Sequence, residues 1–296
     1  MRARTPSSPW ILLGPSLVLL VVFVVFPVGL AVYESFFQWD LLTDPIYVQI
    51  DNYRALAERR ELLHLVWRTL SFSVMVVAGA MSLGLGLAVL LNRRGRLFAF
   101  ARAAIFSAYV VSWVSVALLF TWLLDADHGV FAAMLKFVHL PRVGFLTDPN
   151  TALATLAGVT VWKITGYALV VFLAGLQSVP PSLLEAAALD GAGRWSRFRF
   201  VVWPLLRPTA AFVATTSLVI SFQTFDVVRI MTQGGPANAT SLFVYAIYEQ
   251  VFLDLSIGKA SAITVIFFVV LVAVASLQFR FWSASASARA RGERRT

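Results

Sequence analysis

The stretch PPSLLEAAALDGAGRWSRFRFVVWPLLRP occupies residues 180–208 and lies between two apolar runs, each long enough to cross a bilayer. Its tandem prolines end the preceding helix, and Ser182 with Glu185 three residues later has the spacing of a capping box. We therefore expect a short helix from Leu183 to about Leu189.

A second short helix is expected after the turn signal Asp190-Gly191. It runs from Arg194 to Val202, and Pro204 interrupts it. Trp195, Phe198 and Val202 share one apolar face, so the segment predicts a helix-turn-helix knob with an exposed aromatic edge. Such a knob suits docking into a groove on a partner protein, or an interfacial position against lipid head groups.

The rest of the chain predicts an all-α membrane protein. Of its 296 residues, 59% are apolar and only 13% are charged. About twenty helical residues cross the hydrocarbon core, and continuous rather than alternating apolar runs favour helices. One transmembrane domain, residues 1–282, is expected, with six spans at about residues 11–33, 67–91, 103–124, 151–176, 209–231 and 260–282.

The basic residues indicate the topology. A cytoplasmic N-terminus places most arginines on the cytoplasmic side, and most acidic residues then fall outside. Both termini are expected in the cytoplasm, with the basic tail 283–296 disordered. The first run is too long for the apolar part of a signal peptide and lacks a clear cleavage site, so an uncleaved span is expected.

Small residues in the second run predict close helix packing. Ala80 with Gly84 and Ser82 with Gly86 form small-xxx-small pairs, which let backbones approach closely in lipid. The partner is expected to be another helix of this chain, with a subunit interface as the alternative.

Charge and composition exclude several function classes. The net charge of +9 comes from basic residues spread along the loops and the tail. The positive-inside bias and contact with anionic lipid account for these residues, so nucleic-acid binding is not expected. The chain has no cysteine, and His64, His128 and His139 are scattered without a metal-ligand spacing, so no metal site is expected. It also lacks a phosphate-binding loop, so any nucleotide hydrolysis would need another chain.

The knob resembles the cytoplasmic EAA loop of permease subunits in binding-protein-dependent ABC importers. The match rests on EAAALDGAGRWSRFRFVVWP, although Trp203 stands where an aliphatic residue is more usual. The segments FLAGLQSVPPSLLEAAALDGA, FDVVRIMTQGGPANAT and GKASAITVIFFVVL resemble the carbohydrate and glycerol-3-phosphate branch, with its maltose-type and glycerol-phosphate-type permeases. The resemblance implies ATPase-coupling roles for Glu185, Ala186, Ala187, Asp190, Gly191, Ala192, Phe198 and Pro204.

The resemblance also implies the rest of the assembly and a type I importer architecture. A second, related permease would complete the pathway as a heterodimer, and two ATPase subunits would bind the EAA loops and use ATP and magnesium. An extracytoplasmic solute-binding protein would deliver the ligand. The chain itself is then a transport subunit of a bacterial-type inner membrane, is no enzyme and binds no cofactor.

Polar residues inside two spans are candidates for the substrate path, because such residues are expensive in lipid. Aromatic rings with amides and hydroxyls suit sugars and polyols. Each has a structural alternative: packing, helix-to-helix hydrogen bonding, snorkelling, or an ion pair between Lys163 and Asp226. Trp162, like Trp113 and Trp122, has the alternative of an interfacial or packing residue. The candidates are Trp162, Lys163, Tyr167, Thr216, Gln223 and Asp226.

Two other classes remain open from the residues alone. An ion-coupled secondary transporter would use the intramembrane charges for coupling. A membrane scaffold or enzyme subunit would have no transport role. The substrate, whether sugar, glycerol 3-phosphate or glycerophosphodiester, is not specified by the sequence.

Overall fold

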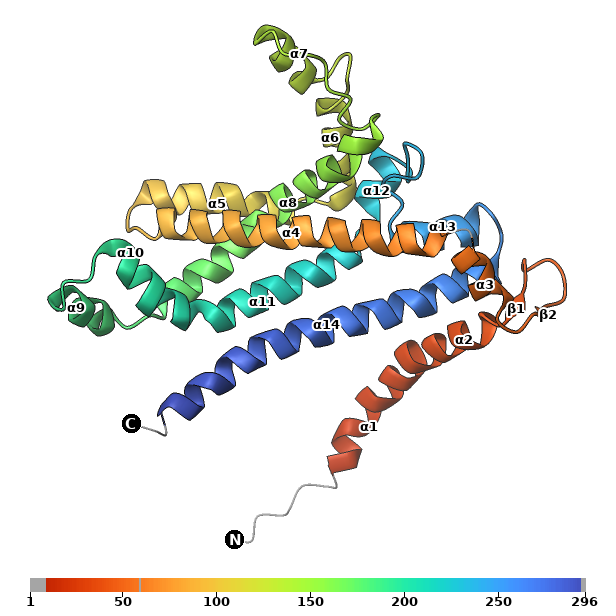
Figure 1. The fold of residues 1–296 in the computed structure, drawn as a ribbon, viewed down its shortest axis with the longest axis horizontal. Coiled ribbons are helices and arrows are strands. Elements are labelled where there is room, and N and C mark those ends of the chain that lie inside the picture. Colours follow the sequence, from red (N-terminus) through yellow and green to blue (C-terminus); the bar gives the residue numbers. More distant parts are fainter. Residues whose placement is uncertain (1–8, 59, 294–296) are drawn as a thin grey trace. The chain divides into compact units, whose positions relative to one another are not determined.

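The computed structural model describes residues 9–58 and 60–293, most of which lie in helices. They form two compact units. One unit lies within residues 1–63 and 246–270, and the other lies within 64–245 and 271–296. Figure 1 colours the elements along the chain.

The first unit opens with an apolar helix that contains one wide turn. Helix α1 (Pro9–Leu20) passes through a π-helical turn (Val21–Val25) into α2 (Phe26–Glu34). The N–H of Phe26 bonds to the carbonyl of Val21, five residues back, immediately before Pro27. None of the π-helical turn or α2 is buried within the chain, which suits a helix facing lipid or another subunit.

A small hairpin and a short helix complete this end of the first unit. Strands β1 (Phe37–Gln38) and β2 (Ile46–Tyr47) pair antiparallel, and α3 (Asp51–Glu58) follows. The buried Asn52 amide donates to the carbonyls of Ser35 and Phe37, both at 2.9 Å. The rest of the unit comes from α13 (Phe243–Phe252) and the start of α14 (Ile257–Glu293).

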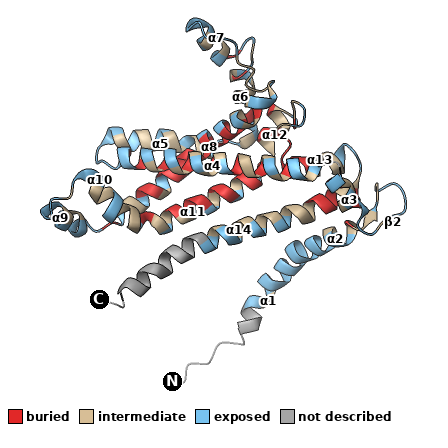
Figure 2. Ribbon diagram, viewed as in Figure 1, coloured by how far each residue is buried: buried red, intermediate tan, exposed pale blue. Residues whose placement is uncertain are grey.

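The second unit is a helix bundle with α8 at its centre. Buried positions lie on several sides of α8, and Figure 2 shows buried residues along both α8 and α11. Helices α5 and α11 both pack against α8. The elements are α4 (Glu61–Leu91), α5 (Arg96–Val110), α6 (Trp113–Leu123), α7 (Val130–Phe137), α8 (Pro149–Gln177), α9 (Pro181–Leu189), α10 (Arg194–Arg197), a π-helical turn (Phe198–Val202), α11 (Trp203–Phe222) and α12 (Asp226–Met231).

The small residues of α4 divide between two environments. Ala80 and Gly84 are buried, and a Cβ on Gly84 would lie 2.5 Å from the Cβ of Ala168 on α8. Gly86 has nothing within 4 Å of its Cβ position, and Ser82 is exposed. Only the first predicted pair therefore packs within the chain.

The membrane-crossing helices differ from the predicted runs at two breaks. Among the described residues, five helices are long and apolar enough to span, and α5 with α6 makes a sixth candidate bent by 99°. The run expected over 103–124 is thus two helices meeting at Val111 and Ser112. The run expected over 209–231 stops at Phe222 and resumes as α12 after a non-helical break at residues 223–225.

Pro204 does not interrupt the helix, contrary to the sequence prediction. Residues 194–222 form one continuous helix, and its π-helical turn ends at Val202, two residues before the proline. The N–H of Trp203 bonds to the carbonyl of Phe198, five residues back. A proline lacks an N–H and its ring crowds the carbonyl four residues earlier, and the wider turn accommodates both effects.

Helix α14 continues through Glu293, where a disordered tail was expected from residue 283. Alanine and arginine are good helix formers, which favours this extension. Residues 294–296 of the expected tail lie outside the described residues.

Candidate functional site: an exposed helical knob and a pocket at a helix break

The knob between α8 and α11 is a short helix, a glycine turn and the start of a long helix. Helix α9 begins at Pro181 with Pro180 as its N-cap, so Ser182 lies inside the first turn and forms no side-chain cap. The predicted capping box is therefore wrong, while the helix itself is present. Gly191 has φ +78°, a conformation that favours glycine and lets the chain reverse into α10.

The knob presents large apolar side chains that the chain leaves uncovered. Leu189 is 90% exposed at the end of α9, and Trp195 is 71% exposed on α10. The Trp195 ring stacks on Phe198 with centroids 5.8 Å apart, which fixes the aromatic edge. Such side chains at the turn of a hairpin between two membrane-crossing helices suit a protein partner.

The residues expected to couple to an ATPase lie together on this knob. Glu185, Ala186, Asp190 and Gly191 are exposed, and Ala187, Ala192, Phe198 and Pro204 are half-buried. The structure thus gathers the whole set on one accessible element. Whether an ATPase binds there stays a prediction.

A pocket of about 150 Å³ lies at the break between α11 and α12. Gln223 and Asp226, two of the predicted path residues, line it together with Trp113 from the start of α6. A carboxylate, an amide and an indole thus meet around one cavity, a set that can hydrogen-bond hydroxyl groups and cover an apolar sugar face. The remaining lining residues are Ile220, Thr224, Phe225 and Val227.

A second polar cluster joins three helices of the same unit. The Tyr167 hydroxyl of α8 donates to Thr216 Oγ1 of α11 at 3.4 Å. The Tyr167 ring also stacks on Tyr109 of α5, with centroids 5.2 Å apart. The predicted path residues Tyr167 and Thr216 are therefore in contact and both are half-buried.

The other two predicted path residues lie elsewhere. Trp162 is 46% exposed and packs edge-on to Phe120 of α6, and it does not line the pocket. Lys163 is 1% exposed, and its ammonium donates to three backbone carbonyls at the end of α5. Among the described residues, Lys163 and Asp226 do not form the ion pair weighed from the sequence.

Sequence reasoning missed the importance of Trp113 and Tyr109. Trp113 was expected to be an interfacial or packing residue, yet its ring lines the pocket and lies 4.8 Å from the Lys163 ammonium. Both residues flank the α5–α6 break, which no proline or glycine marks. No local sequence signal would have identified them.

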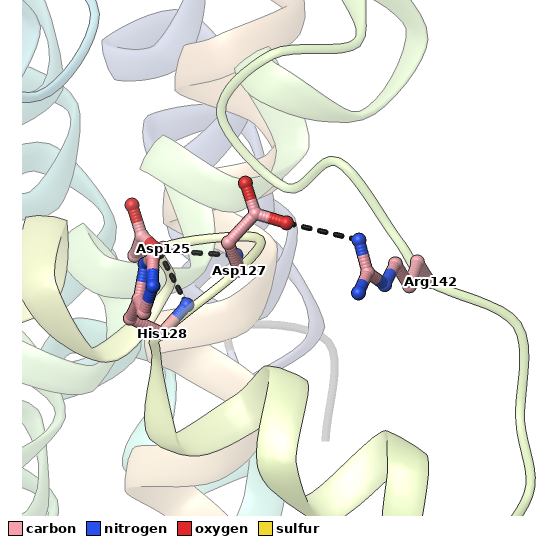
Figure 3. Close-up of polar contacts among 4 residues, drawn as sticks. All are labelled: Asp125, Asp127, His128 and Arg142. Carbon is pink, nitrogen blue, oxygen red and sulfur yellow. Dashed lines mark hydrogen bonds and ion pairs between the residues drawn. The ribbon is translucent and has the colours of Figure 1, made fainter.

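The loop after α6 is held by short polar contacts, drawn in Figure 3. Asp125 Oδ1 accepts the backbone N–H groups of His128 at 2.7 Å and Asp127 at 3.0 Å, and the Asp127 carboxylate pairs with Arg142 at 2.9 Å. The backbone N–H bonds from His128 and Asp127 hold the pKa of Asp125 below its ordinary value. Within the described part of the chain, no group of three or more such side chains is placed to hold a metal ion.

Comparison with known proteins decides the family. Residues 80–285 match the model of the binding-protein-dependent transport system inner membrane component. The chain belongs to this family. The resemblance drawn from the EAA segment is thereby confirmed, and the permease is a multi-pass inner-membrane protein.

The permease also resembles curated relatives along most of its length. It is 36% identical over 274 residues to the sn-glycerol-3-phosphate transport system permease protein UgpA of Brucella abortus, covering 90% of this chain and 92% of that protein. It is 30% identical to the sulfoquinovosyl glycerol transport system permease protein SmoG of Agrobacterium fabrum, covering 90% and 87% of the two chains.

A solved structure shares the fold. A chain of a bacterial ABC transporter involved in the import of the acidic polysaccharide alginate superposes with a TM-score of 0.79. It is 22% identical, and the match covers 93% of this chain and 94% of that one. The predicted all-α importer-permease fold is therefore confirmed, while the side on which the termini lie stays a prediction.

Proposed function

We propose that this permease forms part of the translocation path of an ATP-driven importer for a carbohydrate or a related polyol phosphate. A second permease completes the path as a heterodimer partner, two ATPase subunits hydrolyse ATP with magnesium, and an external binding protein delivers the ligand. The permease itself carries no catalytic or cofactor-binding role. The named substrates of the relatives, glycerol 3-phosphate and sulfoquinovosyl glycerol, support this substrate class.

The observation that carries the proposal is the exposed knob. Its α9 helix bears the EAA sequence, and the uncovered Leu189 and Trp195 side chains provide apolar anchors for a groove on the ATPase. The knob is covalently continuous with α8 and α11, and both belong to helices that are long and apolar enough to cross a membrane. Movement of a docked ATPase would therefore be transmitted directly to the helices that carry the path residues.

The pocket supports the path assignment. Gln223 directly follows α11 and Asp226 begins α12, and α11 is the last part of the continuous helix that begins in the knob at Arg194. Tyr167 and Thr216 join α8 to the same helix. A change in the tilt of this helix would alter the pocket and the polar cluster together, as alternating access requires.

Substitutions in the knob test the proposal. Glu185→Lys reverses a charge on the exposed docking helix, and Gly191→Pro forces φ to about −65° where the chain has φ +78°. Both variants are expected to insert normally but to lose ATP-driven uptake or co-purification of the ATPase. Gly193→Ala is the matched control, because Gly193 has φ −66° and open space at its Cβ position. Wild-type uptake in both test variants would refute the coupling role of the knob.

A further inference from the structure

Lys163 is a buried cation whose hydrogen-bond donors are all used by the backbone. Its Nζ donates to the carbonyls of Ala108 at 3.3 Å, Tyr109 at 3.1 Å and Val111. An ammonium has three donors, so no donor is left for a ligand in this conformation. Lys163 therefore serves this chain's own backbone.

The three carbonyls need such a partner because α5 ends in the middle of the bent α5–α6 pair, which together is long and apolar enough to span a membrane. The last carbonyls of a helix lack partners within the helix, and lipid offers none. They also form the negative end of the helix dipole, which favours a cation. Gly166 lets the backbones of α5 and α8 approach closely at Ile105 and Phe106. This close approach brings the Lys163 side chain of α8 within hydrogen-bond distance of the end of α5.

The same ammonium also contacts the start of the next helix. It lies 4.8 Å from the ring centroid of Trp113, within the range of a cation–π interaction. Trp113 is the first residue of α6 and lines the pocket beside Gln223 and Asp226. One charge thus joins the end of α5, the start of α6 and one wall of the pocket.

We propose that Lys163 is a positioning residue for transport, which fixes the bent α5–α6 pair and holds the Trp113 indole against the pocket without contacting the ligand. The proposal rests on the proposed function, because it takes the pocket to be part of the path. It differs from a role for Lys163 as an intramembrane counter-ion for a phosphate. A phosphorylated ligand would have to be neutralised by other groups, such as those of the second permease.

A double-mutant cycle on the reconstituted complex tests this role. The variants are Lys163→Met, Trp113→Leu, both together, and Lys163→Arg, with Lys136→Met on the exposed face of α7 as the control. Each single test variant is expected to lower initial ATP-driven uptake about tenfold, and the double variant also about tenfold, because residues acting through one contact are not additive. Lys163→Arg is expected to retain uptake within about twofold, since arginine also donates to carbonyls and stacks on indole.

The outcomes separate the possible failures. Multiplicative losses in the double variant, about a hundredfold, would show that Lys163 acts independently of Trp113 and would overturn the proposal. Wild-type uptake by Trp113→Leu would overturn it as well, and this arm decides even if Lys163→Met fails to assemble. Absence of ATP-driven uptake by the wild-type complex would instead refute the proposed function.

Discussion

Replacing Gly166 by alanine should disrupt the contact on which the α5–α8 packing depends. A Cβ at this position would lie 2.5 Å from the carbonyl oxygen of Ile105 and 2.7 Å from the Cα of Phe106. Ordinary contact begins at 3.4 Å, so the two helices must separate by up to about 0.9 Å. Both neighbours are backbone atoms, so no side-chain rotation can relieve the clash.

The expected loss of stability combines two effects. Overpacking of this kind costs about 1–3 kcal/mol. The separation would also stretch the 3.1 Å bond between Lys163 Nζ and the Tyr109 carbonyl to about 4 Å, and a hydrogen bond to a charged group contributes about 1.5–3 kcal/mol. The helices will relax in part, so we expect a total loss of about 2–4 kcal/mol.

The assay is the apparent free energy of unfolding of the purified permease in detergent, obtained by titration with SDS. Gly158→Ala is the control on the same helix, because nothing lies within 4 Å of its Cβ position. The control should be unchanged or more stable by up to about 1 kcal/mol, since alanine favours helix. Equal stability of the two variants would refute the close α5–α8 contact.

Three further predictions concern the core, the knob and the loop after α6. Phe172→Ala removes a fully buried ring of α8 and should lower the free energy of unfolding by about 3–5 kcal/mol in the same titration. The control Phe212→Ala, at an exposed position of α11, should change the free energy of unfolding by less than about 1 kcal/mol. Leu189→Asp should reduce ATPase co-purification without reducing membrane insertion, and an undiminished ATPase yield would argue against docking at α9. The pKa of Asp125 is lowered from 3.8, so its stabilising effect is present above pH 3.8 and is lost as the pH falls through the lower pKa of the folded protein. Asp125→Ala removes the same contacts at neutral pH and should speed the amide hydrogen exchange of residues 127–133, measured by mass spectrometry. Unchanged exchange would show that these contacts do not order the loop.

The helical membrane fold could be predicted because its cause is local. Apolar runs of about twenty residues appear in the sequence wherever helices cross the membrane, and the knob between them stands out by its charge and prolines. The turn at Gly191 was identifiable for the same reason, because an Asp-Gly pair favours a turn. The structure gives Gly191 a positive φ, as such a turn requires. These features depend on neighbours within a few residues.

The breaks in the helices could not be predicted, because their causes are not local. The end of α5 near Val111 is stabilised by Lys163, more than fifty residues later in the chain, since the hydrogen bond to that carbonyl spans 52 positions. Hydropathy alone treats residues 103–124 as one run. Likewise, the rule that proline interrupts a helix failed at Pro204. The preceding π-helical turn is wide enough to accommodate the proline, which has no N–H to donate, within a continuous helix.

The candidate site shows the same division. Gln223 and Asp226 were identified by their polarity in an apolar run, and the pocket brings them together. Trp113 was expected to be an interfacial or packing residue, because tryptophans of membrane proteins are enriched at the membrane–water interface. Its role follows from the bend of 99° between α5 and α6, which only the tertiary structure reveals.

ATP-driven uptake into liposomes tests the central claim most directly. The permease is reconstituted with the proposed second permease and ATPase subunits, and labelled glycerol 3-phosphate and a panel of sugars are supplied with the binding protein. In one set of assays ionophores collapse all ion gradients, and in a second set an ion gradient is imposed without ionophores. The account predicts uptake of at least one of these ligands that requires ATP and the ATPase subunit and that is lost in Gly191→Pro but retained in Gly193→Ala. Uptake that continues without the ATPase and follows an imposed ion gradient would contradict it and would identify a secondary transporter instead.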